Sequence, residues 1–214
     1  MKKISSFLLL FGLLFLVSCS PKIGQWNEKV IKEGKHRASG YHFSWGKIET
    51  LVYRWKVDST WEYHHNDNDQ ADWNKLSGFS FNLFSNHRNS QMTGWVYHPG
   101  RGLVYLAPYY HQDGGTYWAK IPWADAGHQV GEDLPFITAE LGDEIETTLV
   151  VDRGNDETTL KVKNLTSGDE FSFIMTWGFN LGLVREIFPW FGGNKMAPDN
   201  IYFYLMLLKK QRRK

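Results

Sequence analysis

The stretch QMTGWVYHPGRGLVYLAPYYH, residues 91–111, decides the fold class. It consists of two short runs rich in aromatic and β-branched residues, on either side of a Pro-Gly-Arg-Gly sequence. Two such runs around a five-residue loop with two glycines, residues 98–102, are typical of a β-hairpin. We therefore predict antiparallel strands at residues 91–97 and 103–110.

The pairing of the two strands determines which side chains share a face. Successive residues of a strand point to opposite sides, so each run has one mostly aliphatic face and one aromatic and polar face. Pairing Tyr97 with Leu103 aligns the two aromatic faces, whereas a slip of one residue mixes them. The predicted result is a shelf of three rings fringed by polar side chains, which are Trp95, Tyr105, Tyr109, Asn89, Gln91 and His111.

A shelf of this composition has the chemistry of a glycan site. Flat rings stack on the C–H faces of sugars, while amides and imidazoles bond the hydroxyl groups. Arg88, just before the first strand of the hairpin, is suited to hold the carboxylate of a uronic acid in a bidentate pair. The alternative is that both faces are buried and the rings are core, which a chain with 10 Trp, 10 Tyr and 14 Phe permits.

The rest of the chain has the same character. Short aromatic and β-branched runs alternate with Gly, Pro, Asn and Asp, and residues 180–188 are the best candidate for a helical turn or two. This pattern predicts an all-β, single-domain protein with two packed antiparallel sheets, a β-sandwich of the jelly-roll type. The candidate strands are residues 41–45, 50–57, 78–84, 91–97, 103–110, 116–121, 144–151, 158–162, 170–176 and 200–207.

The N-terminus has the features of an export signal. Lys2 and Lys3 precede an apolar run, residues 7–17, which is about half the length that a membrane span needs. Leu-Val-Ser-Cys at 16–19 resembles the bacterial lipobox, which implies cleavage before Cys19 and a lipid on its thiol. An ordinary secretory signal that contains a cysteine is the alternative. Cys19 is the only cysteine, so we expect no disulfide in the mature chain.

These features predict the organisation of the chain and its place in the cell. We expect a lipoprotein signal peptide at residues 1–18, a lipid-anchored linker at 19–39, the β-sandwich at 40–208 and a basic tail at 209–214. The protein is then tethered in the cell envelope, with the outer membrane as the expected location.

Charge excludes one class of partner. The chain has 24 basic and 23 acidic residues, so nothing suggests nucleic-acid binding. Five cations fall in the last six residues, 209–214. Such a tail either rests on anionic lipid headgroups or frays into solvent, and we favour the second interpretation.

The sequence HHNDND at residues 64–69, followed by Asp72, has the composition of a metal loop. It lacks the spacing of an EF-hand, because Ala71 occupies the position of a third oxygen ligand and no glycine follows. We therefore expect an exposed polar turn. Calcium held by Asp67, Asp69 and Asp72 is the alternative, and no other cofactor is expected.

Several motifs carry a resemblance to a known group. They are WNKL at residues 73–76, NHRNS at 86–90 with Gly94-Trp95, and FPWFGGN at 188–194 with Ala197-Pro198. Together they resemble segments of poorly characterised envelope lipoproteins of Bacteroidota. The resemblance implies a concanavalin A-like sandwich, a fold shared by lectins, glycan-binding modules, glycoside hydrolases and polysaccharide lyases, and it does not imply a reaction.

Three functions follow from these observations. The first is an envelope lipoprotein that binds a polysaccharide or oligosaccharide on the aromatic shelf. The second is a polysaccharide lyase for uronic-acid polymers, in which Tyr109 or His111 removes a proton while Arg88 and Asn89 neutralise the carboxylate. The third is a structural or partner-binding lipoprotein. We favour binding over catalysis, and a hydrolase is less favoured than a lyase because no suitable pair of carboxylates stands out.

Overall fold

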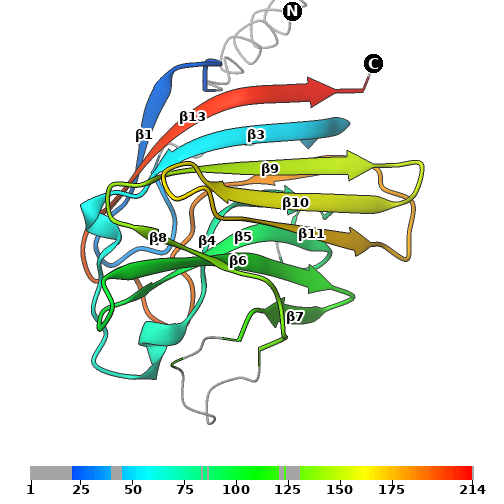
Figure 1. Ribbon diagram of the computed structural model, residues 1–214. Helices are drawn as coiled ribbons and strands as arrows, with labels where there is room; N and C mark the ends of the chain where they lie inside the picture. Colours follow the sequence, from blue (N-terminus) through cyan, green and yellow to red (C-terminus); the bar gives the residue numbers. More distant parts are fainter. Residues whose placement is uncertain are drawn as a thin grey trace, which may run out of the picture.

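The computed structural model describes residues 21–39, 45–82, 84, 85, 87–120, 123 and 131–213 (Figure 1). Two short 3-10 helices, η1 (Ser59–Trp61) and η2 (Asn68–Ala71), accompany the strands. The strands are β1 (Trp26–Ile31), β2 (Trp45–Gly46), β3 (Ile48–Lys56), β4 (Asn74–Ser80), β5 (Ser90–His98), β6 (Leu103–Gln112), β7 (Gly115–Trp118), β8 (Ile137–Glu140), β9 (Glu144–Asp152), β10 (Glu157–Asn164), β11 (Glu170–Thr176), β12 (Val184–Ile187) and β13 (Ile201–Arg212).

The strands form two sheets that pack face to face (Figure 1). One is six-stranded, in the order β1-β13-β3-β9-β10-β11, and the other is seven-stranded, in the order β2-β12-β4-β5-β6-β7 with β8 also paired to β6. The pairings between these strands are antiparallel. The predicted all-β, two-sheet antiparallel sandwich is therefore confirmed.

The outer face of the six-stranded sheet faces water. Its strands alternate buried and accessible residues, as expected for a sheet with one wet face. Charged side chains on this face pair across neighbouring strands: Arg54 with Glu144 and Glu146, and Lys161 and Lys163 with Glu170.

The core between the sheets is rich in aromatic rings. Trp95 of β5 is fully buried, and its ring centroid lies 4.8 Å from that of Trp61 and 6.0 Å from that of Phe203. Trp61 belongs to η1, and its indole nitrogen donates to the carbonyl oxygen of Tyr202 at 2.8 Å. The short helix thus places its tryptophan in the aromatic core, against Trp95 and Phe203.

A buried ion pair connects the two sheets. Glu186 of β12 is only 1% exposed, and its carboxylate accepts a hydrogen bond from the hydroxyl of Tyr53 at 2.8 Å. The ammonium of Lys210, from β13, lies 2.5 Å from the other carboxylate oxygen. Burial, together with the charge of Glu186, raises the pKa of Tyr53 well above its usual value.

The predicted register of the central hairpin is wrong by one residue. Tyr97 pairs with Val104, and His98 extends β5 to pair with Leu103, so the loop has four residues. The amides of Arg101 and Gly102 both donate to the carbonyl oxygen of His98, and Gly102 takes a positive φ of 66°. Because side chains alternate, this slip exchanges the faces of one strand relative to the other.

Other boundaries also differ from the predictions. The linker predicted at 19–39 contains β1, which pairs with β13, and the basic tail predicted from residue 209 continues β13 as far as Arg212. The helical turn expected at 180–188 is wrong, because β12 occupies residues 184–187.

Two predictions fall on residues that the structure does not describe, namely most of the strand at 41–45 and the lipid site at Cys19. Within the described segments, no helix has the length and hydropathy needed to cross a bilayer.

Candidate functional site

The predicted aromatic shelf does not exist in the form expected. Trp95 and Gln91 point between the sheets, where both are fully buried. The side-chain amide of Gln91 lies 3.5 Å from the carbonyl oxygen of Phe173 on the opposite sheet. The one-residue change of register leaves both of them on the core side, so neither can meet a ligand in solution.

The other rings of the proposed shelf lie on the outer face of the seven-stranded sheet. Tyr105 is covered by Trp123, whose ring centroid is 4.6 Å away, and its hydroxyl accepts a hydrogen bond from Arg101 at 3.2 Å. Tyr109 and His111 are neighbours on this face, with ring centroids 5.4 Å apart. Only the Tyr109 and His111 end of the predicted set therefore lies at a candidate site.

Asn89 and Arg88 have different positions from those expected. Asn89 has a positive φ of 54°, and its side-chain oxygen accepts a hydrogen bond from the amide of Asp113 at 3.0 Å, so it holds a turn together. Arg88 is exposed. Of the two residues assigned to neutralise a carboxylate in the lyase hypothesis, Asn89 thus stabilises a turn and Arg88 faces solvent.

A small cavity opens next to Tyr109 and His111. Its volume is about 40 Å³, enough for a water molecule but not for a ring, so a larger ligand would lie over it. The residues that line it come from β4, β5, β6, β12 and two loops: Lys75, His87, Met92, His111, Ile187 and Trp190. We call these six residues, together with Tyr109, the outer-face site.

Glycine creates the space for the site. Gly94 lies on the outer face of β5, and a Cβ there would come within 3.0 Å of the Trp73 ring and 3.1 Å of the Tyr109 Cβ. A side chain at this position would push the two rings away from the sheet. Gly192 allows the loop after Phe191 to touch β4, because a Cβ at Gly192 would overlap the carbonyl oxygen of Trp73.

Two segments far apart in the sequence meet at the site. The backbones of Lys75 and Trp190 exchange hydrogen bonds of 2.8 and 2.9 Å. The half-buried indole of Trp190 stacks on the ring of His36, with centroids 5.8 Å apart, and the guanidinium carbon of Arg37 lies 4.7 Å from its centroid. The loop therefore presents an aromatic surface beside a group of nitrogen-bearing side chains.

Lys75 is the central charge of the site. Its ammonium lies 4.3 Å from the centre of the Tyr109 ring and donates to the carbonyl oxygen of Trp73 at 3.0 Å. Burial lowers the pKa of Lys75 from 10.5 to about 8, although the charge of Asp72 acts in the opposite direction.

The pKa values of two neighbouring groups, His111 and Tyr109, are shifted by the same buried environment. Burial, with the charges of His87 and Lys75, lowers the pKa of His111 to about 4. The imidazole is therefore neutral at pH 7, and its Nδ1 lies 2.9 Å from the hydroxyl of Thr116. Burial raises the pKa of Tyr109 to about 12. Both shifts oppose the lyase hypothesis, because a tyrosine that holds its proton and a weakly basic imidazole are poor bases.

The carboxylates of the proposed calcium loop have other partners. Asp67 caps η2 and pairs with Lys195, which lowers the pKa of its carboxyl group, and Asp69 lies 3.6 Å from the same ammonium. The side chain of Asp72 lies against Gly193. In the described residues, no three or more His, Cys, Asp or Glu side chains form a group that could hold a metal ion.

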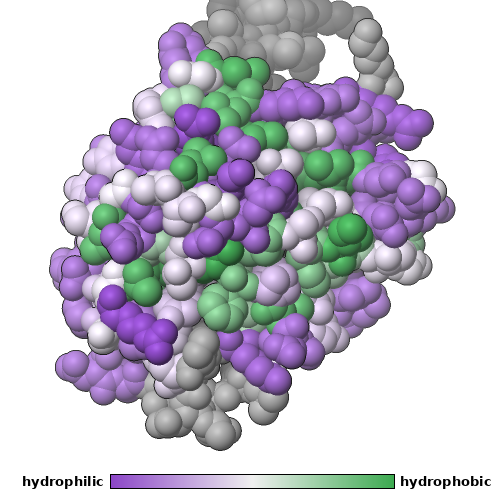
Figure 2. Space-filling model, in the orientation of Figure 1, coloured by the Kyte–Doolittle hydropathy of each residue, from purple (hydrophilic) through white to green (hydrophobic). Residues whose placement is uncertain are grey.

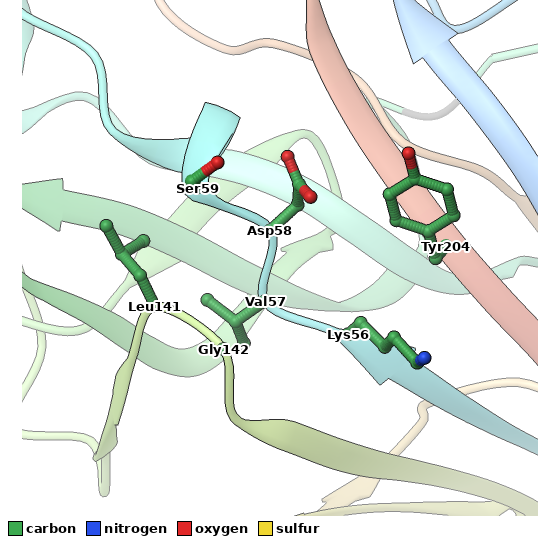
Figure 3. Close-up of a pocket in the computed structure, with 7 residues that line it drawn as sticks. All are labelled: Lys56, Val57, Asp58, Ser59, Leu141, Gly142 and Tyr204. Atoms are coloured by element: carbon green, nitrogen blue, oxygen red, sulfur yellow. The ribbon is translucent and has the colours of Figure 1, made fainter.

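A second, larger hollow lies at one end of the six-stranded sheet. Its volume is about 380 Å³, and Figure 3 shows the carboxylate of Asp58 and the hydroxyl of Tyr204 directed to the same side of it. Asp58, however, caps η1 by accepting from the amide of Thr60, and the ammonium of Lys56 lies 4.7 Å from the centre of the Trp26 ring. The lysine and the aspartate that line this hollow thus already have partners within the fold.

The sequence contained a signal for the outer-face site that the hairpin argument did not use. Lys75 and Trp190 belong to the motifs at 73–76 and 188–194, which the sequence analysis used only for the resemblance to envelope lipoproteins. Both motifs combine tryptophan with asparagine, and Asn74 accepts a hydrogen bond from the amide of Gly192 at 2.7 Å. The two motifs form one structural unit.

Comparisons with known proteins identify only the fold. No protein-family model and no curated protein matches the sequence. Among solved structures, a scytalido-glutamic peptidase with a transition-state analogue inhibitor is 11% identical, with 91% of this chain and 77% of that chain covered and a TM-score of 0.40. Lectin I from Ulex europaeus, in complex with a methyl glycoside of α-L-fucose, is 10% identical, with 78% and 73% covered and a TM-score of 0.32.

A third structure, the enzymatically active domain of tailspike protein 2 of bacteriophage CBA120, is 13% identical with a TM-score of 0.39. This chain is covered over 78% of its length but spans only 23% of that protein. The resemblance to envelope lipoproteins of Bacteroidota stays a prediction. The chain is thus a two-sheet antiparallel β-sandwich with distant structural similarity to legume lectins and to a glutamic peptidase.

Proposed function

We propose that the protein binds an acidic saccharide on the outer-face site. The observation that carries this proposal is the position of Lys75, whose part-buried ammonium is held against the Tyr109 ring. Burying a cation is costly, and an anionic ligand beside Lys75 would offset this cost.

The surroundings of Lys75 favour a sugar as the carrier of that charge. The half-buried indole of Trp190 offers apolar surface to the C–H face of a sugar ring. His87 and His111, with ring centroids 5.2 Å apart, supply nitrogen groups for hydroxyl or acidic oxygens. A carboxylate or sulfate beside Lys75 would be held by charge-assisted hydrogen bonds.

The site selects for anions by its composition. None of the residues that line the cavity is acidic, whereas Arg37 and Lys75 contribute two permanent or nearly permanent cations around Trp190. A neutral saccharide would not offset the cost of burying the Lys75 ammonium. We therefore expect the acidic group to contribute a large share of the binding energy.

Matched ligands test this proposal. We would titrate the purified full-length protein, by calorimetry, with oligogalacturonate and with its methyl ester, and with a sulfated oligosaccharide and its desulfated form. We expect one acidic member to bind and its neutral counterpart to bind at least about tenfold more weakly, the effect of losing one charge-assisted hydrogen bond. Equal affinity within both pairs, or no binding of either acid, would refute the proposal.

Variants locate the binding. Lys75→Met and Trp190→Ala should each lower the affinity for the acidic ligand by about tenfold or more. Lys161→Met is the matched control, because Lys161 lies on the opposite sheet and pairs with Glu170. If Lys161→Met has the larger effect, the ligand binds elsewhere on the molecule.

A further inference from the structure

The C-terminal end of β13 is a rigid basic surface. Lys209, Gln211 and Arg212 pair with β3, and the amide of Arg213 donates to the carbonyl oxygen of Lys47 at 2.8 Å. Figure 2 shows hydrophilic residues gathered along this end of the strand, at the upper right. The cations are therefore fixed by backbone hydrogen bonds at the corner of the six-stranded sheet.

A register shift decides which of these cations face solvent. The bulge between Leu207 and Lys209 changes the alternation, so Lys210 points to Glu186 in the interior. Lys209, Arg212 and Arg213 are exposed.

Two further cations add to this corner. Lys47 is exposed beside Arg213. The guanidinium of Arg153 donates to the carbonyl oxygen of Ile48 at 2.9 Å, so it lies beside the residue that follows Lys47. Glu49 accepts a hydrogen bond from Gln211 at 3.3 Å. The corner thus carries several cations, with Glu49 as a nearby carboxylate.

The N-terminal segment arrives at the same corner. Ile23 forms a bridge with Leu207, and the amide of Gly24 donates to the carbonyl oxygen of Leu207 at 2.9 Å. Lys22 is exposed, and Ile23 is 63% exposed.

We propose that this corner rests on an anionic bilayer surface. The contact surface consists of five cations and one apolar side chain: Lys22, Lys47, Lys209, Arg212, Arg213 and Ile23. Two observations point to a bilayer: the charge of the surface, and the Leu-Val-Ser-Cys sequence at 16–19, which resembles a lipobox and ends only a few residues before Lys22. Basic groups near an anionic leaflet are attracted to it within a Debye length.

A second group of cations provides a contrast. On the outer face of the six-stranded sheet, Lys161 and Lys163 lie 3.1 and 3.4 Å from the carboxylate of Glu170. This carboxylate offsets one of the two positive charges, so we expect this pair of lysines to attract anionic lipid less than the corner does. The membrane contact therefore fixes the orientation of the sandwich.

Lysine labelling of the full-length chain in vesicles tests the proposal. The protein is reconstituted in phosphatidylcholine with or without phosphatidylglycerol, acetylated briefly, and each lysine is quantified by mass spectrometry. We expect Lys22, Lys47 and Lys209 to be labelled several-fold more slowly when phosphatidylglycerol is present, and the protection to disappear at high salt. Lys161 and Lys163 should be labelled equally in both vesicles.

A charge-reversal variant separates this contact from anchoring alone. Arg212→Glu combined with Arg213→Glu should restore fast labelling of Lys209 and Lys47 on phosphatidylglycerol vesicles, while Lys161→Glu combined with Lys163→Glu should not. Circular dichroism checks that both double variants are folded. Equal labelling of Lys209 in the two lipids, or protection of Lys161 and Lys163 instead, would overturn the proposal.

Discussion

Replacing Lys75 by methionine should make the protein more stable while it removes ligand binding. The pKa of Lys75 falls from 10.5 to about 8 in the folded state, mainly because of burial. At about 1.4 kcal/mol for each unit, this corresponds to about 3 kcal/mol of destabilisation at pH 7. The variant loses the contact with the Tyr109 ring and the hydrogen bond to the Trp73 carbonyl oxygen, together about 1.5 kcal/mol. The net gain in the free energy of unfolding is therefore about 1.5 kcal/mol.

The stabilising effect of Lys75→Met should depend on pH in a definite direction. Because the folded-state pKa is depressed, the unfolded chain binds the extra proton between about pH 8 and pH 10.5, and the destabilisation is complete below pH 8. It falls to about 1 kcal/mol at pH 10. The stabilising effect of Lys75→Met should thus disappear by pH 10, where the lost contacts dominate.

Urea unfolding followed by tryptophan fluorescence measures this difference at pH 7 and pH 10. Lys161→Met serves as the control, and because Lys161 is an exposed surface residue we expect it to change stability by less than about 0.5 kcal/mol at either pH. If Lys75→Met is less stable than the natural chain at pH 7, or equally stabilised at both pH values, Lys75 is a structural residue. A residue that lowers stability is expected at a functional site.

Three further predictions follow from the same contacts. The acidic ligand should bind more tightly as the pH falls from 7 towards 5, since a bound anion raises the pKa of His111 from about 4, and calorimetry should find this slope absent in His111→Gln. Trp95→Ala should lower the free energy of unfolding by about 4 kcal/mol and leave ligand affinity unchanged at low temperature, because Trp95 belongs to the core; a specific loss of binding would contradict the structure. Glu186→Gln should lower the free energy of unfolding by about 3 kcal/mol, since it removes the negative charge that faces the ammonium of Lys210, and Tyr53→Phe should lower it by about 1 kcal/mol. Urea unfolding measures both, and an unchanged stability of Glu186→Gln would show that water solvates Lys210.

The strands of the six-stranded sheet were predicted well for a physical reason. One face of this sheet is charged and wet, so the alternation of β3, β9 and β10 is visible in the sequence. Strands expected at 50–57, 144–151 and 158–162 differ from those observed by a few residues at their ends.

The seven-stranded sheet could not be predicted in the same detail. In β12 and β5 nearly every residue is buried, because loops cover the outer face, so no alternation distinguishes one face from the other. The register of the hairpin then depended on the length of the loop after His98, and a difference of one residue moved Trp95 from the proposed shelf to the core.

The candidate site was predicted only in part for a related reason. Tyr109 and His111 were found through the hairpin, and both lie at the outer-face site. Lys75 and Trp190 come from separate segments whose contact depends on the approach of Gly192 to β4, which no local pattern reveals.

The place of β13 in its sheet sets the order in which the protein can assemble. This strand is the last in the chain, yet it lies between β1, the first, and β3. While the chain is still being synthesised, the N-terminal strand has no neighbour, and the six-stranded sheet stays open until the final residues leave the ribosome. The closing of this sheet is therefore a late step in folding, because it needs contacts between the two ends of the chain.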